Sequence, residues 1–193
     1  FVVGKSLTDQ ALRPGAEYFG LLRQLRAGGL TIHSRVVQQA KPAAIRSAIQ
    51  SFEPDVVHFI CHGGLDPQRG SYLKLASDEA GQEAQWFAAQ IWDALRAAKR
   101  PAPVVVLNAC HSSEAAPAAL VEPPLGDRQM GSLAAELVAQ GAPIVVGMSG
   151  SVADQACRPF TRRFGEALVG GEPLVAATAQ GRWAAFLRGR PET

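Results

Sequence analysis

A histidine and a cysteine stand just past the ends of two short apolar segments of this sequence. His62 follows the segment at residues 55–60, and Cys110 follows the segment at residues 103–109. Both segments are rich in valine and other apolar residues and are closed by small residues, a pattern typical of buried parallel strands with both faces covered. Neighbouring strands lie about 4.8 Å apart, so two such strands that end at the same sheet edge would bring an imidazole and a thiol within reach of each other. The pattern indicates a cysteine nucleophile with a histidine base.

A second interpretation of the same two residues is structural. Buried cysteines are common in protein cores, and a histidine at a strand end is often only hydrogen-bonded. However, ligand sites of doubly wound folds form at the carboxyl ends of strands, and His62 and Cys110 occupy corresponding positions on two strands. The sequence by itself leaves the structural and the catalytic interpretation open.

The composition indicates a single-domain protein and argues against several kinds of binding site. The 193 residues fit one domain with a full core, and the net charge of +2 comes from scattered basic residues, which argues against nucleic-acid binding. The three cysteines form no CxxC pair, so neither a disulfide framework nor a zinc site is expected, and the two Cys-His dipeptides are weak evidence for a metal.

The sequence also predicts the cellular compartment in which the protein works. The apolar residues 1–4 are too few for a signal peptide or a membrane span, and the odd cysteine count fits a reducing compartment. We therefore expect a cytoplasmic domain cut from a longer protein. Arginine far outnumbers lysine and alanine is abundant, which suits a GC-rich bacterial genome.

Strand-like and helix-like segments alternate along the chain, which predicts an α/β fold with a mostly parallel sheet and helices on both faces. The connection at 112–130 has no periodicity, and so long a loop beside a candidate site is typical of a functional or a mobile segment. Strands are expected at residues 1–3, 30–37, 55–60, 103–109 and 143–148, a hairpin around 71–76, and helices at 17–27, 41–51, 85–100, 132–140, 154–169 and 172–187, with a tail at 188–193.

The motifs in this order resemble the CHAT domain, a caspase-like peptidase domain related to separases, caspases and metacaspases. The resemblance covers residues 1–187 and implies a three-layer α/β sandwich. The matching motifs are Glu17-Tyr18, His58-x-x-x-His62-Gly63, Asn108-Ala109-Cys110, the stretch 133–147, Val152-Ala153-Asp154 before a helix, and 171–183 with Ala176, Ala177 and Gln180.

The resemblance implies catalytic roles by position. His62 is the base and Cys110 the nucleophile, and the backbone N–H groups of Gly63 and Cys110 form the oxyanion hole. A neighbouring imidazolium favours the thiolate that attacks, and fixed donors stabilise the oxyanion that follows. No cofactor and no metal is implied.

The sequence departs from related enzymes where substrate is expected to bind. Asn108 stands where basic-specific relatives carry an aspartate, and a neutral amide cannot supply the charge that anchors a buried arginine or lysine at the P1 position. The segment with Ser149 and Gly150 lacks the bulky residue of many CHAT domains and is expected to line the substrate groove. Asp154 is a further candidate for substrate contact.

The other cysteines and histidines are weaker candidates. Cys61 adjoins His62, but adjacent strand residues point to opposite faces, so Cys61 is expected in the core. Cys157 is expected to be packed on its helix. His58 shares the face of His62 and is expected to support packing, whereas His33 has no evident partner. His111 follows the nucleophile and is expected to be an exposed loop residue, with contact to substrate as the alternative.

Three hypotheses about function follow. The first is a cysteine endopeptidase domain that cleaves a protein partner and is regulated by other domains of its parent chain or by a partner protein. The second is a catalytically silent CHAT-like module that binds proteins. The third, a flavodoxin-like or nucleotide-binding domain, is disfavoured because no glycine-rich phosphate loop follows any strand.

Overall fold

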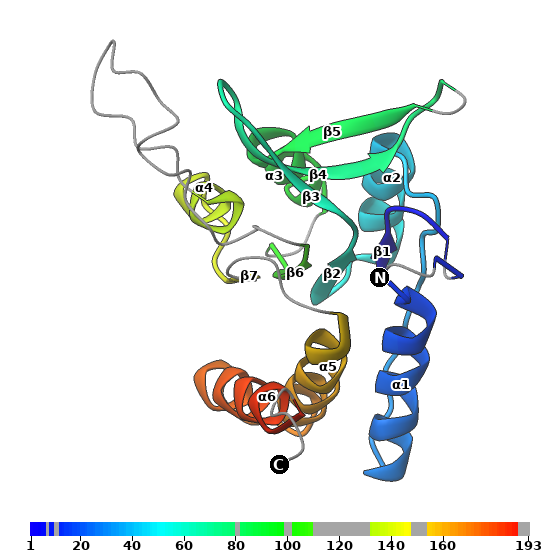
Figure 1. The fold of residues 1–193 in the computed structure, drawn as a ribbon, viewed down its shortest axis with the longest axis vertical. Coiled ribbons are helices and arrows are strands. Elements are labelled where there is room, and N and C mark those ends of the chain that lie inside the picture. The colour runs from blue at the N-terminus through cyan, green and yellow to red at the C-terminus, as the bar shows by residue number, and fades with distance from the viewer. Residues whose placement is uncertain are drawn as a thin grey trace. The chain divides into compact units, whose positions relative to one another are not determined.

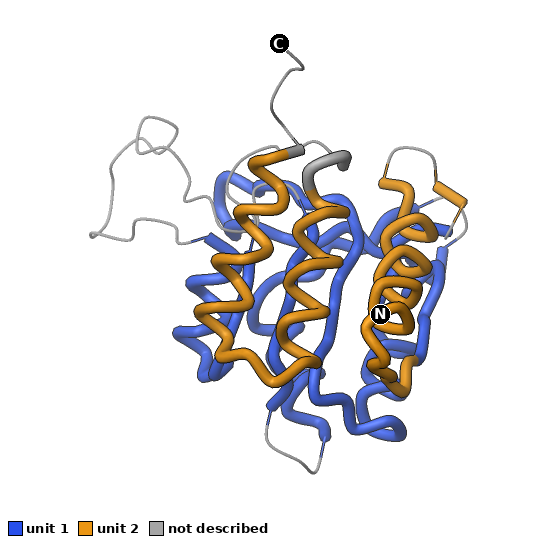
Figure 2. Tube along the Cα trace, turned by 90° about the horizontal axis from the view of Figure 1, so that it is seen from below, with its two compact units in different colours: residues 1–6, 35–151 blue, residues 7–34, 152–193 orange. Residues whose placement is uncertain are grey.

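A computed structural model describes most of the chain and divides it into two compact units (Figures 1 and 2). The first unit contains residues 1–6 and 35–151, and the second contains residues 7–34 and 152–193. The described residues are 1–6, 8–9, 12–79, 82–98, 102–109, 132–147 and 154–188, the side chains of 154–156 and 188 excepted.

A four-stranded parallel sheet forms the centre of the first unit (Figure 1). Its strands are β1 (Val2–Val3), β2 (Val56–Ile60), β6 (Val104–Asn108) and β7 (Val145–Gly147), in the spatial order β1-β2-β6-β7. Neighbouring strands in this order are all parallel. The strands expected at 1–3, 55–60, 103–109 and 143–148 are therefore confirmed, as is the α/β class with a mostly parallel sheet.

Both faces of the two central strands are buried. Val57, Phe59 and the equivalent Val105 and Leu107 of β6 belong to a hydrophobic cluster on one face of the sheet. Residues of the other face are also buried, although two of them, His58 and Asn108, are polar. This double burial explains why both strands are continuous apolar runs and not alternating ones.

Three helices contribute to the hydrophobic cluster, each through an apolar stripe. They are α2 (Pro42–Phe52), α3 (Ala88–Leu95) and α4 (Leu133–Ala139), and their buried residues Ile45, Ile49, Ile91, Leu95, Leu133 and Leu137 lie in the cluster. α4 begins at Ser132, whose hydroxyl accepts a hydrogen bond from the Ala135 N–H at 3.2 Å, and ends before Gly141, which has a φ of 113°. Helices expected at 41–51 and 132–140 are confirmed.

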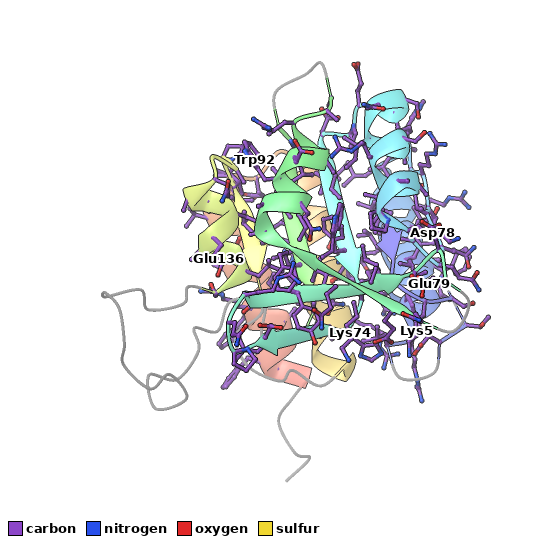
Figure 3. All side chains as sticks on the ribbon, turned by 90° about the horizontal axis from the view of Figure 1, so that it is seen from above. Lys5, Lys74, Asp78, Glu79, Trp92 and Glu136 are labelled. Carbon is purple, nitrogen blue, oxygen red and sulfur yellow. The ribbon has the colours of Figure 1, made fainter. Side chains whose placement is uncertain are left out.

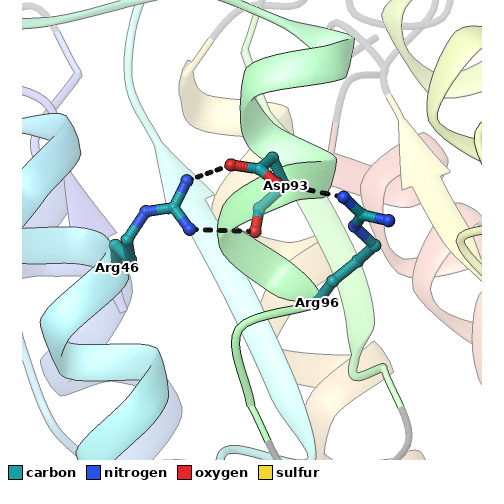
Figure 4. Close-up of polar contacts among 3 residues, drawn as sticks. All are labelled: Arg46, Asp93 and Arg96. Atoms are coloured by element: carbon teal, nitrogen blue, oxygen red, sulfur yellow. Dashed lines mark hydrogen bonds and ion pairs between the residues drawn. The ribbon is translucent and has the colours of Figure 1, made fainter.

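An exposed ion network joins α2 to α3 (Figure 4). The carboxylate of Asp93 contacts the guanidinium of Arg46 on α2 and that of Arg96, the latter at 3.1 Å. Arg46 also donates to the backbone carbonyl of Asp93 at 3.3 Å. The hydrogen bond from Arg46, assisted by that from Arg96, lowers the pKa of Asp93 below its ordinary value. Because the network is exposed, its role is mainly to fix the pairing of the two helices.

A second, antiparallel sheet follows His62. It contains β3 (Gly63–Asp66), β4 (Gly70–Ala76) and β5 (Glu83–Phe87), in the order β3-β4-β5. The hairpin expected around 71–76 is confirmed. The helix expected over 85–100 is wrong at its start, because 85–87 pair with β4 and α3 begins only at Ala88. Trp86 lies opposite Leu73 and packs edge-on to Phe59, so long-range strand pairing overrides the local helical pattern.

The strand expected at 30–37 is also wrong. Only Val37 takes part in a β contact, a single parallel bridge to Val2, through hydrogen bonds from Val3 N–H to Val37 O at 2.8 Å and from Val37 N–H to Phe1 O at 2.9 Å. β1 is too short to pair with more residues, and most side chains of 31–36 are exposed. The segment therefore lacks both the partner and the burial that a strand requires.

The described part of the second unit contains three helices: α1 (Pro14–Ala27), α5 (Asp154–Val169) and α6 (Leu174–Arg188). α5 packs against both α1 and α6. Glycines allow this close packing, because a Cβ atom on Gly165 would lie 2.6 Å from Leu21 Cδ1, and one on Gly181 would lie 2.9 Å from the Phe160 ring. Helices expected at 17–27, 154–169 and 172–187 are confirmed.

The helix pair α1 and α5 shares a buried polar contact. The Thr161 hydroxyl of α5 donates a hydrogen bond to Oε1 of the buried Glu17 in α1 at 2.7 Å. Glu17 belongs to the Glu17-Tyr18 motif of the sequence. A carboxyl group buried between helices stabilises their packing only while hydrogen-bond donors satisfy it.

We expect Thr161→Val to lower the free energy of unfolding by about 1–3 kcal/mol, because it removes a buried donor while keeping the side-chain shape. Urea unfolding followed by circular dichroism measures this. Thr178→Val is the matched control, since the Thr178 hydroxyl donates only to the Leu174 carbonyl of its own helix at 2.8 Å. Equal effects of the two substitutions would contradict a special role for the Glu17 contact.

Candidate active site

His62 lies at the point where the chain leaves the parallel sheet and enters the antiparallel one. It follows β2 by one residue, Cys61, and immediately precedes β3. Its carbonyl oxygen accepts a hydrogen bond from the Lys74 N–H of β4 at 2.8 Å, and its side chain is half-buried. The backbone on both sides of His62 is thus fixed by two sheets, which restricts where the imidazole can lie.

The pairing of β2 with β6 determines which residues share the sheet edge with His62. The last paired residues are Ile60 and Asn108, and the ladder continues with a hydrogen bond from the Cys61 N–H to the Asn108 carbonyl at 3.2 Å. His62 is two residues past Ile60, and Cys110 is two residues past Asn108. Cys110 itself lies outside the described residues, as does the loop expected at 112–130.

Because side chains alternate along β2, His62 and its neighbour Cys61 face opposite sides of the sheet. Val57, Phe59 and Cys61 face the hydrophobic cluster, so His58 and Ile60 face the other side of the sheet. His62 is the next position on the side of His58. The ring of His58 is buried and lies 5.4 Å from the ring of Phe1, in keeping with the packing role that its position predicts.

The N–H of Gly63 points away from the neighbouring strand. The bond from Lys74 N–H to His62 O makes residues 62 and 74 a hydrogen-bonded pair, so the next pair, Gly63 and Leu73, is a non-hydrogen-bonded pair of the antiparallel ladder. The N–H and C=O of Gly63 therefore face the open edge of β3. This is the orientation that an oxyanion donor needs, because a donor inside the ladder would already be occupied.

The remaining predicted site residues are only partly described. Asn108 ends β6 and is buried, with a relative exposure of 9%. Ser149 and Gly150 lie outside the described residues. Asp154 is the first residue of α5, but its side chain is not described.

Cys61 is a core residue, as its position in the strand predicts. It is fully buried in the hydrophobic cluster, and burial raises the pKa of its thiol to about 12. Gly4 packs directly on it, since a Cβ atom on Gly4 would lie 2.7 Å from Cys61 Cβ. Cys157 is likewise buried, whereas His33 is exposed. His111 lies outside the described residues.

One partly buried carboxyl group beside the β3-β4 turn has no counterpart in the sequence expectations. Glu136 on α4, labelled in Figure 3, lies against Gly70 at the start of β4, where an added Cβ atom would be 2.9 Å from Glu136 Oε1. Partial burial raises the pKa of Glu136. Gly70 has a φ of 92°, so the turn before β4 needs glycine for its backbone and for the space that the carboxyl fills. Of these two requirements, only the positive φ could be inferred from the sequence, because glycine is the residue that adopts it most readily.

We expect Cys61 to resist iodoacetamide in the folded protein at pH 8. With a pKa of about 12, roughly one thiol in ten thousand is ionised at this pH, and the side chain is inaccessible. Peptide mapping should find Cys61 unmodified until urea is added. Modification of Cys61 at the same rate in the folded and the unfolded protein would show that the thiol is accessible and would contradict the assignment of Cys61 to the core.

The sequence profile of the CHAT domain matches residues 10–189. A search of curated proteins finds no matching sequence. Within the described parts of the chain, no helix is long and apolar enough to cross a membrane, and no three residues of the types His, Cys, Asp and Glu gather as metal ligands would. Since the profile spans nearly the whole chain, and the first unit has a mostly parallel sheet combined with helices, the protein belongs to the CHAT domain family, which is caspase-like and related to peptidases.

Proposed function

We propose that this protein is a cysteine endopeptidase domain in which His62 is the base and Cys110 the nucleophile. The observation that carries the proposal is the register of β2 with β6, which pairs Ile60 with Asn108. The two reactive residues follow these partners at the same distance along the chain. Membership of a caspase-like family supports the same assignment.

The proposed reaction begins with transfer of the Cys110 proton to the imidazole of His62. The thiolate then attacks the carbonyl carbon of the scissile peptide bond, and the carbonyl oxygen becomes an oxyanion. The outward N–H of Gly63 is suitably directed to donate to that oxygen. The backbone N–H of Cys110 is the second donor that the family resemblance assigns.

The second half of the reaction restores the enzyme. His62 gives its proton to the nitrogen of the leaving amine as the carbon–nitrogen bond breaks, leaving a thioester on Cys110. A water molecule, deprotonated by His62, attacks the thioester carbon and releases the acid and the thiol. The proposed substrate is a protein partner, and the proposed control of activity comes from other domains of a longer protein or from a separate regulatory protein.

We expect Cys110→Ala and His62→Ala each to lower peptide cleavage by at least about a thousandfold, because each removes a member of a unit that acts together. Cleavage of a randomised decapeptide library, followed by mass spectrometry, measures this. Cys61→Ala is the matched control: it removes the neighbouring buried thiol and should keep most of the activity.

The library also separates the peptidase from a silent binding module. If the wild-type protein and Cys110→Ala give the same peptide pattern, the domain has no peptidase activity under these conditions and the proposal is contradicted. If Cys61→Ala is inactive while Cys110→Ala still cleaves, the nucleophile has been assigned to the wrong cysteine.

The buried, neutral Asn108 leads to a prediction about specificity. We expect no preference for arginine or lysine at P1 in the wild-type protein, because no charge at this position anchors a basic side chain. Asn108→Asp should raise the relative cleavage after arginine or lysine by about tenfold or more, and Asn108→Ala should not. A wild-type profile dominated by basic P1 residues would contradict the assignment of Asn108 to the P1 pocket.

A further inference from the structure

One face of α6 carries an exposed apolar stripe. Its residues lie at positions i, i+4, i+8, i+11 and i+12, which share one face of a helix, and they are Val175, Ala179, Trp183, Phe186 and Leu187. The four large side chains are 81%, 61%, 52% and 51% exposed at Val175, Trp183, Phe186 and Leu187 respectively. These five residues form a continuous apolar surface, which we call the α6 stripe.

The opposite face of α6 is the one that packs inside the second unit. Ala177 and Gly181 are buried there, and Gly181 lies against the Phe160 ring of α5. The α6 stripe therefore points away from α5, and the described helices of its own unit leave it uncovered. Its apolar residues are not needed for the core of this unit.

The centre of the α6 stripe is aromatic and ordered. The rings of Trp183 and Phe186 stack at 5.7 Å between centroids, with 28° between their planes. Single exposed apolar residues are ordinary, but a contiguous exposed patch marks an interaction surface. Tryptophan and arginine are also the residues that contribute most often to the centres of protein interfaces.

The charge on α6 has one sign. The 15 residues of this helix include two arginines and neither aspartate nor glutamate. Arg182 is exposed, lies on the same face as Val175 and Phe186, and forms no ion pair with any residue that the structure describes. The surface complementary to the α6 stripe is therefore apolar in its centre and acidic at its margin.

We propose that the α6 stripe binds an amphipathic helix of a partner protein, whose apolar residues pack on Trp183 and whose flanking Asp or Glu residues pair with Arg182. The helix would use anchors spaced three and four residues apart, as apolar helix faces do when they dock on one another. This inference goes beyond the proposed function and does not depend on peptidase activity.

Charge and size favour this occupant over a second copy of the chain. Two α6 helices would bring their arginines together with no acidic residue between Leu174 and Arg188 to pair with them. The α6 stripe is about 18 Å long and one helix wide, a footprint of roughly 200–400 Å², whereas a stable dimer buries about 800 Å² per partner. A stripe of this size suits a weak and reversible complex.

A peptide library tests the predicted chemistry of the partner. The probes are helical peptides as long as α6, with leucine at every third and fourth position and aspartate, glutamine or lysine in equal proportion at the flanking positions. They are selected on the wild-type protein and counter-selected on Val175→Glu, which places a negative charge on the α6 stripe. We expect aspartate to exceed lysine at the flanking positions by about tenfold. Equal or higher lysine, or no peptide that survives counter-selection, would overturn the proposal.

Affinities of a selected peptide, measured by fluorescence anisotropy, test the individual residues. Trp183→Ala and Val175→Glu should each raise Kd at least about tenfold, and Arg182→Glu should favour the same peptide with its aspartates replaced by lysine. Val138→Glu is the matched control, because Val138 is an exposed valine on α4 of the first unit. Equal effects of Val138→Glu and Val175→Glu would contradict binding at the α6 stripe. Since Val175 is more exposed than Trp183, Val175→Glu decides if circular dichroism shows that Trp183→Ala is unfolded.

Two further measurements distinguish the other occupants. Sedimentation velocity at micromolar concentration should show a monomer, and the wild-type protein should not sediment with phosphatidylserine vesicles. A dimer that Val175→Glu dissociates would assign the α6 stripe to a second copy of the chain. Vesicle binding that Val175→Glu abolishes would assign it to a membrane surface, and either result would overturn the proposal.

Discussion

The parallel pairing of β2 with β6 is the interaction on which the candidate site depends. It joins Ile60 to Asn108 at the end of the ladder and extends by one further hydrogen bond, from the Cys61 N–H to the Asn108 carbonyl at 3.2 Å. A shift of one residue would send His62 to the opposite face and place Cys61 at the edge. The buried cluster opposes such a shift, because it would remove Phe59 from the cluster and turn the polar His58 into it.

A second constraint acts where the chain leaves the parallel sheet. His62 lies between the two sheets: it follows β2 by one residue, and its carbonyl is bonded to Lys74 of the antiparallel sheet. The same bond determines that Gly63 directs its backbone groups outward. One hydrogen bond thus relates the position of the proposed base to that of the proposed oxyanion donor.

The fold was predictable from the sequence wherever local pattern and long-range packing agree. The runs around Phe59 and Leu107 are buried on both faces, and glycine or serine marks the ends of helices such as α4, so these elements were predictable. Residues 85–87 were not, since Trp86 and Phe87 fit a helical stripe as well as a strand, and only pairing with β4 distinguishes the two. Of the candidate site, Cys61 could be assigned to the core by alternation alone. The outward direction of the Gly63 backbone groups depends on the ladder register, which local sequence does not encode.

The central claim is that the imidazole of His62 acts on the thiol of Cys110. The most direct test is the pH dependence of Cys110 alkylation by iodoacetamide, mapped by mass spectrometry in the wild-type protein and in His62→Ala. An imidazolium beside the thiol stabilises the thiolate, so the wild-type rate should reach half its maximum well below the ordinary thiol pKa of about 8.5, and His62→Ala should return the midpoint to about that value or above. Identical pH profiles for the two proteins would contradict the dyad.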